Sequence, residues 1–398
     1  MESLILSYDF DIRNSRPIIE KFLAAMEDGL VGKPSTMPMI PCFTDVPTGN
    51  EEGVFLSIDF GGTNLRCMLL KIENRKIVDV KQKKVTIDKK TPTGELLFST
   101  IAKFIESFVE ENAAHIQLRP NRILPAGFSF SFPIHQTHIS SGRLLYWGKG
   151  FVATGVQGQD VIQLLHAELD KRGLNWIRVV ALCNDTVGTM ASLGVEDPET
   201  CIGVILGTGT NACYREKVSN VTKIQALRQK EEEELARMGR EEPYRPSPPE
   251  SSDFMAINTE WGGFTGFPMT AEDDAIYAKT QKFGEQRFEK QTSGKYLPMI
   301  ARKCVRKAIK NGWIFKDIMQ KGYLKWDEAE ELTPVEMSQV HFDETPDLSK
   351  AKDIILHFFG EAGKLIPKEM LKTEDVAMVR RLFAAIVTRS AKFIGLDC

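Results

Sequence analysis

The sequence lacks long apolar runs, paired cysteines and an excess of charge of one sign. No run approaches the roughly 18 apolar residues of a membrane-spanning helix. The N-terminal segment MESLILSYDFDIRN has neither a basic start nor a long apolar core. We therefore expect a cytoplasmic protein without integral membrane association. The net charge is only -3, so nothing indicates electrostatic capture of nucleic acid, and any negative ligand has to be bound locally.

The cysteines follow no regular spacing. There are seven, an odd number, and no two of them form a CxxC pair. This pattern is typical of reduced thiols in the cytosol, and of neither a disulfide framework nor a zinc site. They are Cys42, Cys67, Cys183, Cys201, Cys213, Cys304 and Cys398.

The chain of 398 residues is long enough for two domains, and we expect two lobes with a cleft between them. Apolar periodicity predicts helices at residues 15–30 and 95–112, and helical stripes dominate residues 288–394. A buried strand is expected to end near Cys183, with a helix beginning at Asp185. This mixture of strands and helices predicts an α/β protein.

Two apolar hairpins turn around glycines. VFLSIDFGGTNLRCMLL spans residues 54–70, and CIGVILGTGTNACY spans residues 201–214. Four identical residues recur between them at a constant offset of 147, either by chance or because each lobe contributes one such hairpin to the cleft. They are Ile58, Gly62, Thr63 and Asn64, followed by Ile205, Gly209, Thr210 and Asn211.

Glycine turns of this kind suit a polyphosphate. Backbone amides beside a glycine can donate to phosphate oxygens because no Cβ blocks their approach. Thr63, Asn64, Thr208 and Thr210 add neutral donors, and Asp59 suits an accompanying Mg²⁺ through water. No GxxxxGK[ST] P-loop occurs, and GTGTNA, which fits a dinucleotide pattern, continues as a strand where that fold demands a helix. Plain hairpins remain the alternative.

Asp185 stands where a buried strand ends and a helix begins. Such an Asp is either a helix cap or a carboxylate that accepts the proton of an attacking hydroxyl in phosphoryl transfer. Several polar residues in apolar frames look structural one by one, but together they suit a ligand rich in hydroxyl groups, such as a sugar. They are Ser131, Lys149, Glu260, Gln286 and Glu289.

Six motifs in order resemble the eukaryotic hexokinases: LSIDFGGTNLR, SFSFP, LCNDTVGTM, GTGTNACY, INTEWGGF and FEKQTSGKYL. The resemblance implies the two-lobed actin-like, Hsp70-like (RNase H-like) ATPase fold. It also implies a transferase that phosphorylates the 6-hydroxyl of glucose and other hexoses with ATP and Mg²⁺ in glycolysis. It makes Asp185 the catalytic base. It assigns the hexose to Ser131, Lys149, Asn184, Asn211, Glu260, Gln286 and Glu289, and the ATP phosphates with Mg²⁺ to Asp59, Gly61, Gly62, Thr63, Asn64, Arg66, Gly207, Thr208, Gly209 and Thr210.

The resemblance also implies a division into lobes. Residues 54–183 are expected to form the small lobe, and residues 1–53 with 184–398 the large lobe. The charged and proline-containing segment 217–253 is interpreted as a surface insertion, with a partner-binding element as the alternative.

Two departures from the family pattern stand out. Gly148 replaces the Thr that usually precedes the Lys of WGKGF, and the family's later adenosine-binding segments do not follow residues 379–394. The chain is therefore expected to be a fragment, a truncated product or a diverged form that binds adenosine weakly. Leu382, Ile386 and Phe393 are expected to lie on an incompletely covered face.

Two alternative functions remain open at this point. A glucose-binding sensor or regulatory protein that has lost its nucleotide half would share the sugar residues. An actin-like or chaperone ATPase would explain the glycine hairpins but not the sugar residues.

Overall fold

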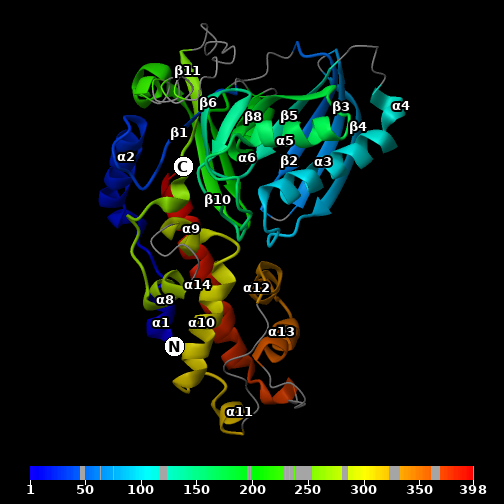
Figure 1. Cartoon of the computed structure of the whole chain (residues 1–398). Coiled ribbons are helices and arrows are strands. Elements are labelled where there is room, and N and C mark those ends of the chain that lie inside the picture. Colours follow the sequence, from blue (N-terminus) through cyan, green and yellow to red (C-terminus); the bar gives the residue numbers. More distant parts are fainter. Residues whose placement is uncertain are drawn as a thin grey trace. The chain divides into compact units, whose positions relative to one another are not determined.

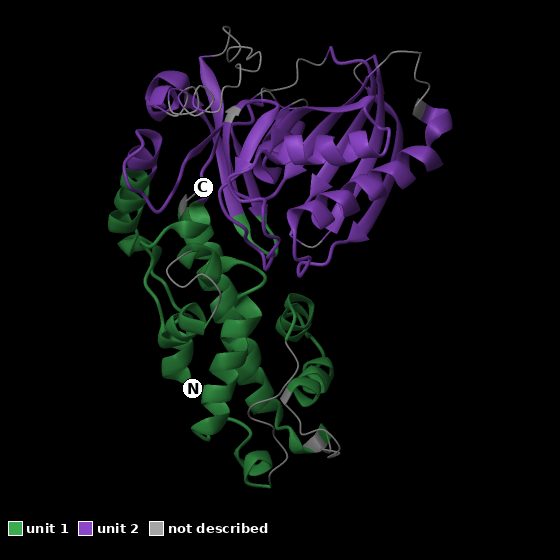
Figure 2. Ribbon diagram, in the orientation of Figure 1, with its two compact units in different colours: residues 1–25, 206–210, 261–398 green, residues 26–205, 211–260 purple. Residues whose placement is uncertain are grey.

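A computed structural model gives the fold of residues 1–44, 50–62, 64–74, 76–116, 123–194, 197, 199–226, 229, 233, 237, 253–279, 286–321, 332–359 and 368–397. The chain divides into two compact units (Figure 2). Unit 1 comprises residues 1–25, 206–210 and 261–398, and unit 2 comprises residues 26–205 and 211–260. The predicted lobes divide the chain at other positions and remain a prediction.

Unit 2 contains a five-stranded sheet (Figure 1). Its central strand β2 pairs antiparallel with β3 and parallel with β5, and β8 continues the parallel part beyond β5. The predicted hairpin at residues 54–70 is therefore confirmed. In spatial order the strands are β4 (Lys76–Thr86), β3 (Asn64–Glu73), β2 (Gly53–Phe60), β5 (Leu124–Phe130) and β8 (Ile177–Cys183).

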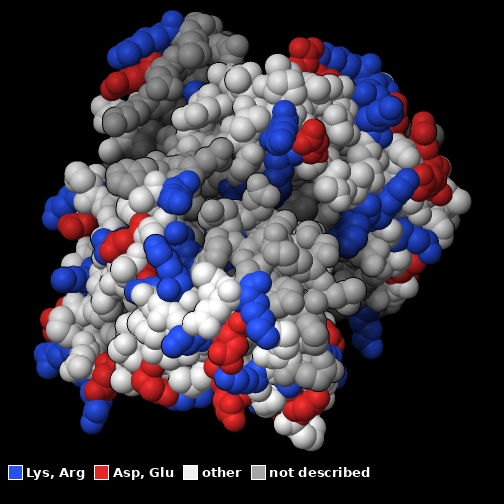
Figure 3. Space-filling view, turned by 90° about the horizontal axis from the view of Figure 1, so that it is seen from below, with Lys and Arg blue, Asp and Glu red and all other residues white. Residues whose placement is uncertain are grey.

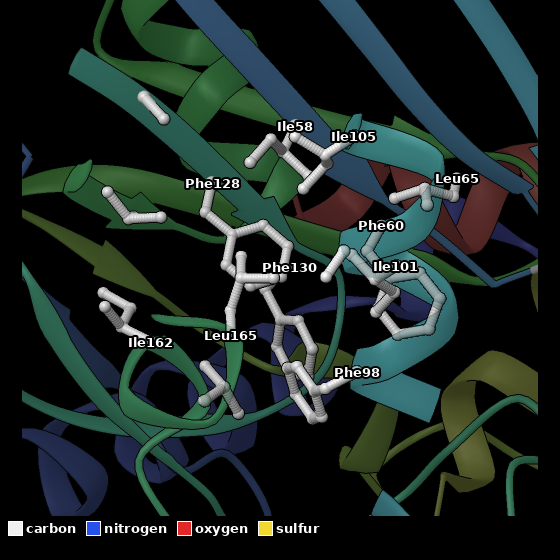
Figure 4. Close-up of a cluster of buried hydrophobic side chains, with 14 of the residues drawn as sticks. Ile58, Phe60, Leu65, Phe98, Ile101, Ile105, Phe128, Phe130, Ile162 and Leu165 are labelled. Atoms are coloured by element: carbon white, nitrogen blue, oxygen red, sulfur yellow. The ribbon is translucent and has the colours of Figure 1, made fainter. Parts of the chain in front are cut away.

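Two amphipathic helices, α3 (Gly94–Glu111) and α5 (Val161–Lys171), bury their apolar faces in the same core as this sheet. Figure 4 shows side chains of β2 and β5 packed with Ile101 and Ile105 of α3 and Leu165 of α5. Each fully buried side chain of this size stabilises the fold by about 1.5–3 kcal/mol. Also in this unit are α4 (Ala113–Ile116) and the hairpin of β6 (Ile134–His138) and β7 (Ser141–Leu144).

A second sheet of unit 2 has four strands, in the order β1 (Ile40–Cys42), β11 (Phe254–Asn258), β10 (Thr210–Lys217) and β9 (Ile202–Leu206). The helix α6 (Asp185–Gly194) contributes Val187 and Met190 to a small core with Cys42, Cys213 and Ala256. Strand β8 therefore leads directly into a helix that packs on the other sheet. The predicted strand ending at Cys183 and the helix start at Asp185 are confirmed.

The start of the predicted insertion is part of the folded unit. Lys217 pairs with Phe254 in the sheet, and Val221, just after the turn η2 (Val218–Asn220), is only 2% exposed. Lys223 donates to Gly29 O of α2 (Arg16–Leu30) at 2.7 Å and also to Pro38 O. The beginning of the segment is therefore anchored in unit 2 by Lys217, Val221 and Lys223, and its interpretation as a surface insertion remains a prediction. Most of residues 227–252 lie outside the described residues.

Unit 1 is mainly helical, which confirms the helical stripes predicted for residues 288–394 in the parts of that range that the structure describes. Before residue 288 it contains α1 (Glu2–Leu6), η1 (Ile12–Asn14), the first part of α2, η3 (Trp261–Gly263) and α8 (Ala271–Lys279). The later elements are α9 (Arg287–Thr292), α10 (Leu297–Lys310), α11 (Lys316–Gln320), α12 (Pro334–His341), α13 (Ser349–Phe359), η4 (Lys368–Met370) and α14 (Thr373–Asp397).

The prediction of an incompletely covered face on the last helix was wrong. Leu382, Ile386 and Phe393 of α14 are all fully buried. Leu382 and Ile386 belong to a core to which α1, α10 and α12 also contribute, and Phe393 stacks on Phe267 with ring centroids 4.2 Å apart. Packing by segments distant in sequence covers this face.

The surface carries charges of both signs. On the face shown in Figure 3, Lys and Arg side chains are interspersed with Asp and Glu. In the described part of the chain, no helix is long and apolar enough to cross a membrane.

Candidate active site

The ends of the parallel strands of unit 2 bring several predicted site residues to one edge of the five-stranded sheet. Asp59 of β2 lies in register with Ser129 of β5, and Ser131 N donates to Phe60 O at 3.1 Å. Strand β8 pairs with β5 up to Cys183, so Asp185 follows at the same edge. Carboxyl ends of parallel strands form the ligand crevices of α/β proteins.

Asp185 is the first residue of α6, and Asn184 acts as the cap of this helix. The Asn184 Oδ1 accepts the Thr186 N–H at 3.1 Å and the Thr186 hydroxyl at 2.9 Å. Asp185 Oδ1 also accepts the Thr186 N–H, at 3.0 Å. A carboxylate is favoured at a helix N-terminus by the peptide dipoles. Asn184 and Asp185 therefore share the Thr186 N–H, and Asn184 also binds the Thr186 hydroxyl.

The surroundings of Asp59 disfavour its ionised form. Burial raises the pKa of Asp59, and the nearby charge of Asp185 raises it further. Arg66, the hydrogen bond from Ser129 and Lys149 oppose this increase without cancelling it. A carboxylate whose ionisation is disfavoured by burial and by a neighbouring negative charge is stabilised by an added positive charge.

Lys149 reaches the first glycine turn. Its Nζ donates to Ser131 O at 2.7 Å and lies 5.4 Å from the centroid of the Phe132 ring. A Cβ on Gly62 would lie 2.6 Å from Lys149 Cδ, so only glycine leaves room for this side chain. Lys149, Ser131 and the Gly61–Gly62 turn therefore lie close together.

Asn211 and Glu260 form one hydrogen-bonded group on the four-stranded sheet. Asn211 Nδ2 donates to Glu260 Oε1 at 3.0 Å, and Asn258 Nδ2 donates to the same oxygen at 2.9 Å. Asn258 Oδ1 in turn accepts from Asn211 at 2.8 Å. Glu260 and Asn258 are buried, so these bonds replace the water that the carboxylate has lost.

The second glycine turn lies in unit 1, where Glu289 of α9 contacts it. Thr210 N donates to Glu289 Oε2 at 3.2 Å, and a Cβ on Gly209 would lie 2.5 Å from the same oxygen. The Gln286 carboxamide lies against Gly262, where a Cβ would overlap with it. Gly207 and Thr208 are exposed. The turn and both α9-associated sugar candidates therefore form one group within this unit.

Three of the predicted sugar residues have left-handed backbone conformations. The φ angles are 57° at Lys149, 52° at Glu260 and 59° at Gln286. Residues other than glycine rarely adopt this region of φ and ψ. The resulting backbone strain is often found at functional sites. Seven described residues other than glycine have a positive φ, and three of them are these sugar candidates.

The remaining predicted residues are placed as follows. Gly61 N donates to Asn64 O at 3.0 Å across the first turn, and Arg66 lies in register with Asp59 on the neighbouring strand. Thr63 lies outside the described residues.

Sequence reasoning missed three supporting residues. Asn258 accepts a hydrogen bond from Asn211 and donates one to Glu260. The Thr186 hydroxyl donates to Asn184, and Ser129 donates to Asp59. All three lie inside or beside the motifs INTEWGGF, LCNDTVGTM and SFSFP, so their spacing was the available signal.

Comparisons with known proteins identify the family of this chain. Two family models, both described as hexokinase, match residues 2–195 and 201–398. The hexokinase of Kluyveromyces lactis is 34% identical over 384 residues, which are 95% of this chain and 73% of the relative. Hexokinase-1 of Saccharomyces cerevisiae is 33% identical over 393 residues, which are 97% of this chain and 74% of the relative.

Solved structures agree as well. A hexokinase from Schistosoma mansoni complexed with glucose is similar with a TM-score of 0.77 and 29% identity, covering 99% of this chain and 82% of that one. The fold is thus that of the two-lobed actin-like ATPases, which hexokinase structures share. The chain belongs to the hexokinase family and is an ATP-dependent sugar kinase. These relatives favour the enzyme over the non-catalytic sensor.

Proposed function

We propose that this hexokinase transfers the γ-phosphoryl group of ATP to the 6-hydroxyl of glucose and related hexoses. The observation that carries this proposal is the position of Asp185 at the carboxyl end of β8, with its neighbour Asn184 capping the following helix. The glucose bound by the similar Schistosoma mansoni hexokinase supports the choice of sugar.

In the proposed reaction, the 6-hydroxyl oxygen attacks the γ-phosphorus, its proton passes to Asp185, and ADP leaves. A positioned carboxylate of this kind contributes about 10²–10⁴-fold to the rate. Asn184, Ser131 and Lys149 are proposed to bind sugar hydroxyls at the edge of the sheet in unit 2. Asn211 and Glu260 are proposed as a second group of sugar ligands on the four-stranded sheet of the same unit, and Gln286 and Glu289 as a third group in unit 1.

The ATP phosphates are proposed to bind the two glycine turns. The binding residues of the first turn are Gly61, Gly62, Thr63 and Asn64, with Arg66 beside them. Those of the second turn are Gly207, Thr208, Gly209 and Thr210. The exposure of Gly207 and Thr208 supports this role, because a ligand can reach their backbone.

Mg²⁺ is proposed to accompany ATP near Asp59. The raised pKa of Asp59 and the neighbouring charge of Asp185 support a cation there. Among the described residues, no group of three or more His, Cys, Asp or Glu side chains could hold a metal ion by itself. Mg²⁺ commonly binds through one or two carboxylates, water and substrate phosphates, so this donor set fits the ion. The bound ion would neutralise phosphate charge.

The enzyme is proposed to catalyse the first step of glycolysis and to be located in the cytoplasm. The six described cysteines are free thiols, which supports a reducing compartment.

Substitution of Asp185 by Ala tests the proposed mechanism. We expect kcat for glucose 6-phosphate formation, measured in a coupled assay, to fall by about 10²–10⁴-fold. Calorimetric glucose binding and thermal stability should stay close to wild type. Asp170→Ala, which removes a surface carboxylate 2.9 Å from Arg178, is the control and should keep full activity. Retention of more than a tenth of wild-type kcat by the Asp185 variant would remove this residue from the mechanism.

A further inference from the structure

Trp261 contacts the second glycine turn and is absent from the predicted site. Its side chain is 1% exposed, and its indole N–H donates to Thr210 Oγ1 at 3.1 Å. The ring packs edge-to-face on Phe288 of α9, with centroids 5.6 Å apart and an interplanar angle of 88°. A buried indole N–H needs an acceptor, so this bond fixes both the ring and the threonine hydroxyl.

Two more contacts hold the same turn. Glu289 accepts the Thr210 N–H at 3.2 Å. After α9, Gly294 N donates to Gly207 O at 2.9 Å, and Lys295 N to Thr208 O at 3.3 Å. The N–H groups of Thr208 and Gly209 take part in none of these bonds. The turn is therefore held through its carbonyl groups and through Thr210.

We infer that Trp261 is a positioning residue for phosphoryl transfer. By binding the Thr210 hydroxyl it fixes the orientation of the turn at residues 207–210, so that the Thr208 and Gly209 amides are directed at the phosphates of ATP. This inference rests on the proposed role of the turn in ATP binding. A preorganised donor pair loses little freedom when the ligand arrives, which is why rigid support of a turn improves its affinity.

Trp261→Phe tests the inference, because it keeps an aromatic ring against Phe288 but removes the donor to Thr210. We expect KM for ATP to rise about three- to tenfold, the effect of one lost neutral hydrogen bond. The Kd for glucose should change by less than about twofold. Trp176→Phe makes the same chemical change at a half-buried tryptophan that packs on the core of unit 2 and should leave KM unchanged.

A double-mutant cycle tests whether Trp261 acts through the Thr210 hydroxyl. If Trp261 acts through the Thr210 hydroxyl, Thr210→Val should raise KM for ATP at least as much as Trp261→Phe. The double variant should then be no worse than Thr210→Val alone. Additive effects of the two substitutions would overturn the inference. So would a lower melting temperature of Trp261→Phe with an unchanged KM for ATP, because a purely structural role predicts that result.

Gly207→Ala separates this inference from the proposed function. A Cβ at Gly207 meets no atom within 4 Å, so this substitution does not disturb the fold but does narrow the approach to the turn. If it raises KM for ATP and Trp261→Phe does not, the turn binds ATP but Trp261 does not position it. If Gly207→Ala leaves KM for ATP unchanged in an active enzyme, the proposed role of the turn itself is wrong.

Discussion

Asn211 donates its side-chain amide to the carboxylate of Glu260 at 3.0 Å, although the two residues are 49 positions apart in the chain. A third residue, Asn258, donates to the same carboxylate oxygen at 2.9 Å. The buried carboxylate therefore has its orientation set before any ligand binds. Because one oxygen receives both amides, the geometry of the group depends on each member.

Substitution of Asn258 by Leu should weaken sugar binding and leave KM for ATP unchanged. It removes a hydrogen bond to a buried carboxylate, and bonds to charged groups contribute about 1.5–3 kcal/mol, so Kd for glucose should rise about 10- to 100-fold. Isothermal calorimetry measures this change. Asn220→Leu is the matched control, because Asn220 donates to Glu216 in an exposed amide–carboxylate pair at 2.8 Å. Equal effects of the two variants would show that Asn258 has no special role.

Substitution of Asp59 by Asn should stabilise the ligand-free protein at neutral pH and weaken ATP binding. Burial and the Asp185 charge raise the pKa of Asp59, so the folded state binds this proton more tightly than the unfolded state. The ionised carboxylate therefore destabilises the fold, and this effect is complete above the raised pKa and absent below the ordinary value of 3.8.

Denaturant unfolding from pH 4 to pH 7 checks the first half of this prediction. The stability gain of Asp59→Asn over wild type should grow across that range. KM for ATP at fixed Mg²⁺ should rise about tenfold, since one charged ligand contact is lost. Asp170→Asn serves as a surface control. A destabilised variant at pH 7 would contradict the electrostatic assignment.

Lys223 should give the protein a pH-dependent stability that Lys223→Met lacks. Burial lowers the pKa of Lys223 from 10.5 to about 8, so between these values the unfolded state binds more protons than the folded state. Stability relative to the Met variant should therefore rise with pH from 8 to 10.5, by at most about 3 kcal/mol. Urea unfolding at several pH values measures the difference between the two proteins. A difference independent of pH would show that burial does not lower the pKa of Lys223.

Replacement of residues 227–252 by a short Gly/Ser linker should change the free energy of unfolding by less than about 1 kcal/mol, because loop closure entropy grows slowly with length. Starting the replacement at Lys217 should instead destabilise the protein by at least about 2 kcal/mol. That longer replacement removes the buried Val221 and the contacts of Lys223. Denaturant unfolding of both variants distinguishes the two results. Equal stability would show that residues 217–223 belong to the surface insertion and contribute nothing to the folded unit.

Sequence by itself determined the local elements and most of the site candidates. Glycine turns, apolar periodicity and the switch from strand to helix at Asp185 act over a few residues, so they can be predicted from neighbours in the chain. The expectation that GTGTNA continues as a strand, which argued against a dinucleotide-binding motif, is confirmed by strand β10. This feature is also local in the sequence.

Tertiary structure decided which of these residues support one another. The Trp261–Thr210 bond joins positions 51 residues apart, and the Thr210–Glu289 bond joins positions 79 residues apart. The burial of Leu382, which was expected on an incompletely covered face, likewise depends on segments far away in the chain, and so do the contacts of Lys223 with Gly29. Periodicity shows which face of an element is apolar, but only the packing of distant segments determines what covers that face and which polar groups meet there.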